Sequence, residues 1–270
     1  MKISVVTVTY NCVETVEETI RSVLHQDYSD IDYVVIDGCS EDGTLDIIKK
    51  YRTCIATLLV EPDKGIFDVM NKSLQYVKGE YVLFMNAGDK FVSNDVVSRV
   101  FQNQQHDEDL IYGDTYNQTE FGFRLRGADD IYSHNPSNHD LVFKSQGFCH
   151  QSLFTKTDVL RRVRFDLSYP VGADYDTTAK VYYHGNRKIQ NVGFPISIFD
   201  DRRGGVSHYK EVKMYKERFV MFDYKPDLKD WFVVYKQMYI SIIKRKLEEC
   251  LPNYIKKYRA RKYEKSVEKC

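Results

Sequence analysis

Asp89 has the residue type and the position that most directly suggest chemistry in this sequence. It closes the turn Asn86-Ala87-Gly88-Asp89, which follows the apolar run Tyr81–Met85. A carboxylate oxygen is a hard ligand of the kind that Mg²⁺ and Mn²⁺ prefer, and a glycine lets the backbone approach a ligand closely. We therefore predict a metal ligand at Asp89, with an ordinary turn aspartate as the alternative.

Two further carboxylates, Asp174 and Asp176, stand near the start of a predicted helix that continues through Tyr183. A carboxylate at this place could remove a proton from a substrate hydroxyl as a general base. It could equally cap the helix and interact favourably with the helix dipole. The residue types alone leave both roles open.

Other polar residues follow predicted strands. Asp37 could accept hydrogen bonds from a ribose or a base, whereas Ser40 is better explained as a turn and cap residue. Lys64 beside Gly65, near a helix start, could meet a phosphate or a base carbonyl, although a solvated turn lysine is the simpler explanation. His150 stands among apolar residues, which favours a structural histidine over a metal ligand.

A pair of arginines, Arg202 and Arg203, follows the last predicted strand and precedes two glycines. This composition suggests a mobile loop that can clamp an anion, and an ordinary turn is the alternative.

Four apolar runs, each followed by a polar turn, are the predicted strands that position these groups: Ile3–Val8, Ile31–Ile36, Ile55–Val60 and Tyr81–Met85. Helical spacing of apolar residues follows at least three of the runs. This order favours an α/β fold with a doubly wound, mostly parallel sheet flanked by helices. In such a sheet ligands bind beyond the carboxyl ends of the strands. The first turn, Thr9-Tyr10-Asn11, holds no glycine, which argues against a dinucleotide-binding enzyme.

The second half of the chain is less regular. We predict a hairpin from Thr115–Thr119 and Phe121–Leu125, a final strand at Lys188–Phe199, and a body that ends at residue 228. Residues 229–270 form a tail with 12 basic and 5 acidic residues, whereas the body has 27 and 34. Apolar residues recur at helical spacing from Trp231 until Pro252. Such a helix could lie in a membrane interface, or it could pack on the body or on a second subunit.

Composition excludes several classes of protein. The 270 residues carry 39 basic and 39 acidic side chains, so no overall charge suggests nucleic acid as a partner. The cysteines form no CxxC pair, which argues against a zinc site or a disulfide framework and for a reducing, cytoplasmic compartment. A strand begins almost at once, and no apolar stretch is long enough to span a membrane, so we expect neither a signal peptide nor a spanning helix. The six cysteines are at positions 12, 39, 54, 149, 250 and 270.

Taken together, the motifs resemble those of family 2 glycosyltransferases with the GT-A fold, in particular the bacterial branch that builds capsular, O-antigen and exopolysaccharide chains. The resemblance covers Lys2 to about Ser207 and depends on the order and spacing of six motifs: Val8-Thr9-Tyr10-Asn11, Val35-Ile36-Asp37-Gly38-Cys39-Ser40-Glu41-Asp42-Gly43-Thr44, Glu61-Pro62-Asp63-Lys64-Gly65-Ile66-Phe67-Asp68-Val69-Met70-Asn71-Lys72, Asn86-Ala87-Gly88-Asp89, Cys149-His150-Gln151-Ser152 and Gly172-Ala173-Asp174-Tyr175-Asp176.

The resemblance implies a nucleotide-sugar pocket in residues 1–112 and a half that binds the acceptor and carries the base in residues 113–228. The pocket residues it implies are Thr9, Tyr10, Asn11, Glu14, Asp37, Ser40, Lys64, Gly65, Asn71, Asn86, Ala87, Gly88 and Asp89. Asp89 matches the last acid of the family's Asp-x-Asp element, which holds Mn²⁺ or Mg²⁺. The sequence departs from the commonest form of that element, because Asn86 and Gly88 stand where carboxylates are frequent.

The resemblance also implies an inverting, metal-dependent transfer of a hexose. Asp174 matches the family's catalytic base, with Asp176 in reserve, and Ala173 replaces the usual Glu. His150, Gln151 and Asp176 would face the acceptor, and Arg202 with Arg203 would hold the diphosphate. The implied partners are a nucleotide-sugar donor, most simply a UDP-sugar, and a lipid-linked saccharide acceptor. The implied location is the cytoplasm, with peripheral attachment to the inner face of the membrane through the tail.

Three alternatives accompany this interpretation. A sugar nucleotidyltransferase would share the sheet and the metal-binding acid, but it should carry a glycine-rich loop with an arginine after the first strand, which Thr9-Tyr10-Asn11-Cys12 does not provide. A catalytically weak or inactive nucleotide-binding protein is suggested by the reduced acid motif, and an interaction protein by the basic tail. A homo-oligomer remains open.

Overall fold

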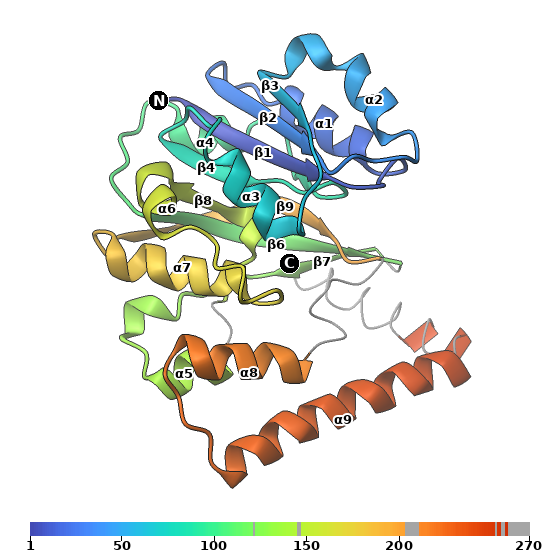
Figure 1. Cartoon of the computed structure of the whole chain (residues 1–270), viewed down its shortest axis with the longest axis vertical. Coiled ribbons are helices and arrows are strands. Elements are labelled where there is room, and N and C mark those ends of the chain that lie inside the picture. Colours follow the sequence, from blue (N-terminus) through green and yellow to red (C-terminus); the bar gives the residue numbers. More distant parts are fainter. Residues whose placement is uncertain (121, 145–146, 203–210, 252, 255–256, 259–270) are drawn as a thin grey trace.

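The computed structural model describes residues 1–120, 122–144, 147–202, 211–251, 253–254 and 257–258. Over these residues the chain forms a nine-stranded sheet with the order β3-β2-β1-β4-β8-β6-β9-β5, and β7 pairs with β6 (Figure 1). The predicted α/β fold with a mostly parallel sheet flanked by helices is confirmed.

Parallel strands form the first half of the sheet: β1 (Ile3–Thr9), β2 (Ile31–Asp37), β3 (Thr57–Val60) and β4 (Tyr81–Phe84). Successive side chains of a strand point to opposite faces, so a strand covered on both faces must be apolar throughout. In β1, Val6 and Val8 belong to one core cluster and Val5 to the other. This two-sided burial explains why the strands read as uninterrupted apolar runs.

Helices cover both faces of the sheet. On one face lie α1 (Val16–Leu24), α2 (Thr44–Lys50) and α4 (Val96–Phe101), and on the other lie α3 (Ile66–Ser73), α6 (Thr157–Val163) and α7 (Ala173–His184). In the part of the chain that the structure describes, three short 3-10 turns connect elements: η1 (Arg52–Cys54), η2 (Tyr132–His134) and η3 (His150–Ser152).

The second half of the sheet mixes strand directions. Its strands are β5 (Lys90–Phe91), β6 (Leu110–Thr119), β7 (Gly122–Arg126), β8 (Leu153–Lys156) and β9 (Ile189–Asp200). Strand β8 runs antiparallel to both β4 and β6, and β9 runs parallel to β6. The predicted hairpin is present, because Thr115–Thr119 of β6 pairs with Gly122–Arg126 of β7. Phe121, the first residue of the predicted second strand, lies outside the described residues.

Two helices were not predicted from the sequence, α5 (Asn138–Phe143) and α8 (Glu211–Met221). Helix α9 (Leu228–Cys250) begins at a capping box formed by Asp227 and Asp230. Its buried Val234 shares a core cluster with Phe219 of α8. The first turns of α9 therefore pack on the body. Within the described residues, no helix combines the length and the apolar content that crossing a membrane requires.

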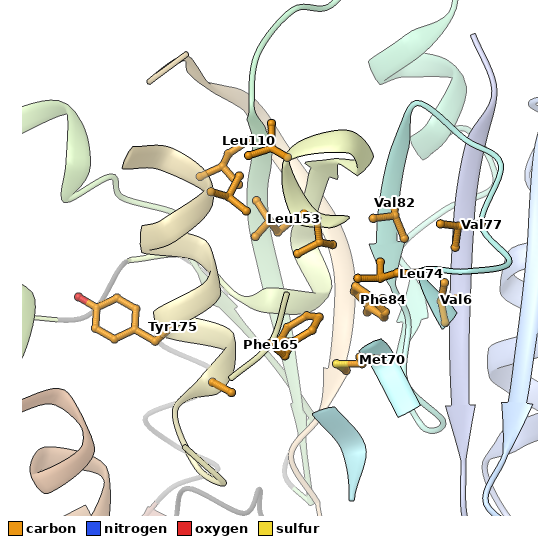
Figure 2. Packing of buried hydrophobic residues seen from close by; sticks show 14 of the residues in the cluster. Val6, Met70, Leu74, Val77, Val82, Phe84, Leu110, Leu153, Phe165 and Tyr175 are labelled. Atoms are coloured by element: carbon orange, nitrogen blue, oxygen red, sulfur yellow. The ribbon is translucent and has the colours of Figure 1, made fainter. Parts of the chain in front are cut away.

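Figure 2 shows the larger core cluster, where Phe84 of β4 and Phe165 meet beside Met70 of α3. The rings of Phe84 and Phe165 are 5.5 Å apart in an edge-to-face arrangement. His150 stacks on Phe84 with 5.6 Å between ring centroids. Aromatic packing thus fixes the position of His150 at the boundary between the core and the polar region beyond β4.

We expect Gly79→Ala to destabilise the protein by about 1–3 kcal/mol, because a side chain inserted into a fully packed site must displace its neighbours. A Cβ added at Gly79 would lie 2.3 Å from the backbone nitrogen of Ser4 and 2.8 Å from the carbonyl oxygen of Tyr81. Both atoms belong to paired strands. Urea unfolding followed by far-UV circular dichroism measures the change. The control is Gly127→Ala, where an added Cβ meets nothing within 4 Å; equal midpoints for the two variants would contradict the prediction.

Candidate functional site

The parallel register brings the carboxyl ends of β1 to β4 to one border of the sheet, which we call the site edge. Thr9 pairs with Asp37, and Asp37 pairs with Val60. The segment after β4 continues beside β1, where the Ala87 N–H donates to the carbonyl oxygen of Val8 at 3.4 Å. The predicted donor-side residues from three separate motifs therefore meet at this edge.

Asp37 is wholly buried, and its carboxylate organises the turn after β2. Its Oδ2 accepts hydrogen bonds from Thr9 Oγ1 at 2.6 Å and from Ser40 Oγ at 2.7 Å, and its Oδ1 accepts one from the Ser40 N–H at 2.7 Å. Asp37 and Ser40 thus hold the loop backbone in place. A direct contact between Asp37 and a ribose or base stays a prediction.

The loops after β1 and β2 are joined through Asn11. Its N–H donates to Ser40 Oγ at 2.9 Å, and its Oδ1 accepts from the Glu41 N–H at 2.9 Å. Asn11 has a φ of 45°, a left-handed conformation that asparagine tolerates better than most residues. Tyr10 is 66% exposed and Glu14 is also exposed, so the Tyr10 ring is accessible to a ligand at the site edge.

The turn with Lys64 and Gly65 lies against the same edge. A Cβ added at Gly38, directly after β2, would lie 2.4 Å from Asp63 Oδ2. Gly65 has a φ of 115°, which strongly favours glycine. The side chain of Lys64 is exposed, so it can reach a ligand above this turn.

Asn71, also predicted near a nucleotide, is engaged in the fold. Its Nδ2 donates to the carbonyl oxygen of Phe165 at 2.8 Å, and its Oδ1 accepts from the Phe165 N–H at 2.9 Å. Both amide atoms therefore tie α3 to the segment before α7. Its contact with a nucleotide stays a prediction.

The turn from Asn86 to Asp89 is tight and anchored to α1. The Asp89 N–H donates to the carbonyl oxygen of Asn86 at 2.9 Å, and Gly88 has a φ of 103°. Thr19 Oγ1 accepts from the Gly88 N–H at 2.9 Å and donates to the Asp89 carbonyl oxygen at 2.7 Å. Asn86 Oδ1 is buried without a hydrogen-bond partner among the described residues, so a bound donor group would be stabilised there.

Asp89 is 4% exposed and lies in an electrostatic environment that favours a cation. Burial raises the pKa of its carboxyl group to about 7, hydrogen bonds from the Asp200 N–H and the Gln151 side chain oppose the rise, and the Asp200 carboxylate adds to it. The bond from the Asp200 N–H to Asp89 Oδ1 is 2.9 Å long. A metal ion would relieve this unfavourable burial of charge, so the carboxylate fits a divalent cation.

The protein does not supply a complete metal cage at this place. Among the described residues, no group of three or more His, Cys, Asp or Glu side chains is arranged to hold a metal. A Cβ added at Gly88 would lie 3.5 Å from Asp200 Oδ2, which places the carboxylate of Asp200 against the Asp89 turn. One or two carboxylates are the usual protein contribution when phosphate groups of a substrate complete the coordination of Mg²⁺.

Arg202 adds a positive charge beside these two acids. Its guanidinium makes a bidentate pair with Asp200, with Nε–Oδ1 at 2.7 Å and Nη2–Oδ2 at 2.9 Å. The side chain of Arg202 is 41% exposed, so it remains accessible from the site edge. The other predicted clamp residue, Arg203, lies outside the described residues.

The segment Cys149–Gln151 connects Asp89 with the predicted base Asp174. The side-chain amide of Gln151 donates a hydrogen bond to the carboxylate of Asp89. Burial lowers the pKa of His150, and the carboxylate of Asp174 opposes that change. Burial raises the pKa of the Cys149 thiol to about 11, and the carboxylates of Asp89 and Asp174 both contribute to the rise. The segment therefore contacts the Asp89 turn through Gln151, and its His150 lines a cavity together with Asp174.

Asp174 lies at the start of α7, half-buried, and its Oδ1 accepts a hydrogen bond from the Tyr175 N–H at 2.9 Å. Glu217 of α8 holds the preceding turn, because its Oε2 accepts from the Gly172 N–H at 2.9 Å. Asp174 and His150 line the same cavity of about 10 Å³, together with Phe84 and Phe165. His150 Nε2 is buried and has no hydrogen-bond partner among the described residues.

Asp176, the second candidate for the base, forms an ion pair with Lys180. It is 4% exposed, and its carboxylate lies 2.6 Å from Lys180 Nζ. Burial raises the pKa of Asp176, and the lysine opposes that rise. This ion pair leaves Asp174 as the better candidate of the two. A contact between Asp176 and an acceptor stays a prediction.

Sequence reasoning missed three residues that build the site: Asp200, Thr19 and Glu217. Asp200 stands at the carboxyl end of the last predicted strand, as Asp37 does in the second, and this shared position is a signal that could have found it. Thr19 and Glu217 carry no comparable signal, because each acts through the backbone of a distant segment.

At pH 8 we expect Cys149 and Cys12 to react with iodoacetamide roughly 100-fold more slowly than an unperturbed thiol, because only the thiolate is nucleophilic. Burial raises the pKa of both thiols to about 11. Their thiolate populations become substantial only as the pH rises toward that value. Time-resolved peptide mass spectrometry measures the rates, with the exposed Cys39 and Cys54 as internal controls. Equal rates at Cys149 and Cys54 would show that the site opens readily.

Comparison with known proteins finds relatives over most of the chain. Residues 4–164 match the family described as Glycosyl transferase family 2. A PGL/p-HBAD biosynthesis glycosyltransferase of Mycobacterium tuberculosis is 29% identical over 185 residues, which covers 66% of this chain and 69% of the relative.

Solved structures share the fold. TarS of S. aureus in complex with UDP-GlcNAc superposes with a TM-score of 0.61 and 21% identity over 86% of this chain and 69% of that one. The mannosyltransferase PcManGT from Pyrobaculum calidifontis, in complex with GDP-Man and Mn²⁺, gives a TM-score of 0.60 and 18% identity over 84% of this chain and 65% of that one. At these identities the likeness establishes the common fold.

Proposed function

The chain belongs to glycosyl transferase family 2, and from that membership we propose that it moves a sugar from a nucleoside diphosphate donor to a hydroxyl group of a saccharide acceptor. The observation that carries the proposal is the placement of two acids near the segment Cys149–Gln151: Gln151 hydrogen-bonds to Asp89, and His150 lines a cavity together with Asp174. One acid suits the diphosphate end of a donor, and the other suits the attacking hydroxyl.

The donor is proposed to lie across the site edge, with its nucleotide toward the β1 and β2 loops. The exposed Tyr10 ring and the exposed Lys64 side chain suit a base and a phosphate there. Proteins of the same fold are solved with UDP-GlcNAc and with GDP-Man. We propose a UDP-sugar as the donor, residues 1–112 as the donor half and residues 113–228 as the acceptor half.

A divalent metal, Mn²⁺ or Mg²⁺, would be held by Asp89, with Asp200 beside it and the donor's phosphate oxygens completing the coordination. When bound, the metal would supply positive charge that stabilises the leaving diphosphate. The mannosyltransferase of the same fold is solved with Mn²⁺. Arg202, at the same edge, would add a second positive charge toward the phosphates.

Asp174 would act as the general base in a single displacement. Its carboxylate takes the proton of the acceptor hydroxyl while that oxygen forms a bond to the anomeric carbon. The bond from the anomeric carbon to the diphosphate oxygen breaks on the opposite face, so the anomeric configuration inverts. The pairing of Asp176 with Lys180 supports this assignment.

The acceptor is proposed to be a lipid-linked saccharide in the biosynthesis of a surface glycan. The support is the name of the mycobacterial relative, which assigns it to PGL/p-HBAD biosynthesis. His150 and Gln151 would face this acceptor, since Gln151 hydrogen-bonds to Asp89 and His150 lines a cavity together with Asp174.

Isothermal titration with UDP and with GDP, each with and without Mn²⁺, tests the proposal. We expect metal-dependent binding of one nucleotide, weakened by Lys64→Ala and unchanged by Lys49→Ala, an exposed lysine on α2. The nucleotide that binds then defines the sugar donors to be screened with acceptor lipids. Failure of both nucleotides to bind under all four conditions would overturn the assignment of the site edge as a donor pocket for these nucleotides.

A further inference from the structure

We propose that α9 docks the protein on the surface of a lipid bilayer that contains anionic lipids. The docking surface, which we call the α9 outer face, consists of five apolar or aromatic side chains: Leu228, Phe232, Tyr235, Tyr239 and Ile243. This inference goes beyond the proposed transfer reaction, because it concerns the binding of a lipid surface by α9. It does not depend on the donor site.

The α9 outer face has the spacing of a single stripe along a helix. Its members follow one another at intervals of three or four residues, which places them on one side. Leu228 is 89% exposed, Phe232 and Tyr239 are 69% and 65% exposed, and Ile243 is 48% exposed. Large apolar side chains that are scattered singly on a surface need no explanation, but a continuous row of them indicates an interaction site.

The opposite side of α9 is already used. Val234 is wholly buried, and Trp231 packs on Phe219 of α8 with 5.3 Å between ring centroids. Figure 1 shows α9 on the outside of the molecule, on the far side of α8 from the sheet. One side of the helix is therefore fixed to the body, and the α9 outer face points away from it.

The charges beside the α9 outer face favour an anionic surface. Among the described side chains of α9, the charged residues are four exposed lysines and the buried Asp230: Lys229, Lys236, Lys244 and Lys246. Lysine stems can lie along apolar surface while their ammonium groups reach toward phosphate groups. Aromatic residues with a polar tip, such as Tyr235 and Tyr239, suit the level of the lipid headgroups.

The same charges disfavour a second copy of this chain as the occupant. If two α9 outer faces packed on each other, the lysine side chains of both copies would lie close together at an interface that excludes water. Their positive charges would repel one another. A bilayer with anionic headgroups instead supplies opposite charge to every lysine. Amphipathic helices with lysine beside an aromatic and apolar face lie in the membrane interface for this reason.

Flotation of the full-length protein with vesicles tests the proposal. We expect the protein to float with vesicles of phosphatidylcholine and phosphatidylglycerol at low salt, to bind pure phosphatidylcholine at least tenfold more weakly, and to lose most of its binding in 0.5 M NaCl. The triple variant Phe232→Ser, Tyr239→Ser, Ile243→Ser should bind the anionic vesicles at least tenfold more weakly. All three side chains are exposed, so thermal unfolding of the variant should match that of the parent.

The matched control replaces exposed apolar residues elsewhere, Phe123→Ser with Leu167→Ser, and should leave vesicle binding unchanged. Retention of binding by the triple variant would overturn the proposal, as would a parent protein that does not float with anionic vesicles. A parent dimer in light scattering that the triple variant loses, without vesicle binding, would assign the α9 outer face to a second copy instead. Titration with UDP and GDP reports on the donor site separately, so a failure here and a failure of the proposed function are distinguishable.

Discussion

Asp174→Asn is expected to lower the turnover of the donor sugar by about 10²–10⁴-fold, the usual contribution of a positioned general base. The amide keeps the size of the side chain, and its oxygen can still accept the hydrogen bond that Asp174 receives from the Tyr175 N–H. It cannot take a proton from the acceptor hydroxyl. We therefore expect the nucleotide affinity and the thermal stability of the variant to match those of the parent, while nucleoside diphosphate release with an acceptor-bearing lipid extract falls.

The control for this experiment is Asp158→Asn, which changes a carboxylate whose side chain is 80% exposed on α6. It should leave turnover within twofold of the parent. Asp176→Asn separates the two candidate bases, because it removes the partner of Lys180 inside the protein and should act mainly on stability. Full turnover in Asp174→Asn together with a collapse of turnover in folded Asp176→Asn would transfer the role of base to Asp176.

Asp89→Asn is expected to abolish the effect of Mn²⁺ on nucleotide binding and to reduce turnover by about 10²–10³-fold, as the loss of a preorganised electrostatic group typically does. The asparagine can still accept the hydrogen bond from the Asp200 N–H, so the turn should keep its shape. The side chain loses its negative charge, and with it the attraction for a cation bound to the diphosphate. Titrations with and without Mn²⁺ and initial rates over a series of Mn²⁺ concentrations measure both effects.

Asp46→Asn is the matched control, since its side chain is 81% exposed on α2. Its metal dependence and rate should equal those of the parent. A parent protein that binds its nucleotide equally well in EDTA and in Mn²⁺, with Asp89→Asn unchanged, would remove Asp89 from the metal site. Arg202 would then be the principal positive charge facing the diphosphate.

The predicted position of the site follows from one feature of the chain. A strand buried on both faces must be apolar throughout, so its end is marked by the first polar residues, and in a parallel sheet these ends share one border. The turns after Thr9, Asp37 and Met85 obey this rule, and the register of β1 with β2 and β4 places them together.

By itself, the sequence determined the α/β class, the mostly parallel sheet, the hairpin of β6 and β7 and the helical nature of α9, since each depends on a local period of apolar residues. It did not reveal α5, whose apolar residues Leu141, Val142 and Phe143 are consecutive and show no helical period. Helix α8 was missed although its Val212, Tyr215 and Phe219 recur at helical spacing. Only the tertiary structure decided what the polar residues do. The Asp200 N–H donates a hydrogen bond to Asp89, and the Asn71 side chain donates one to the backbone of Phe165. The carboxylate of Asp37 accepts a hydrogen bond from the Ser40 N–H in the turn that follows it. These pairings join segments that are distant in sequence or depend on burial, because hydrogen bonds and desolvation are set by neighbours in space.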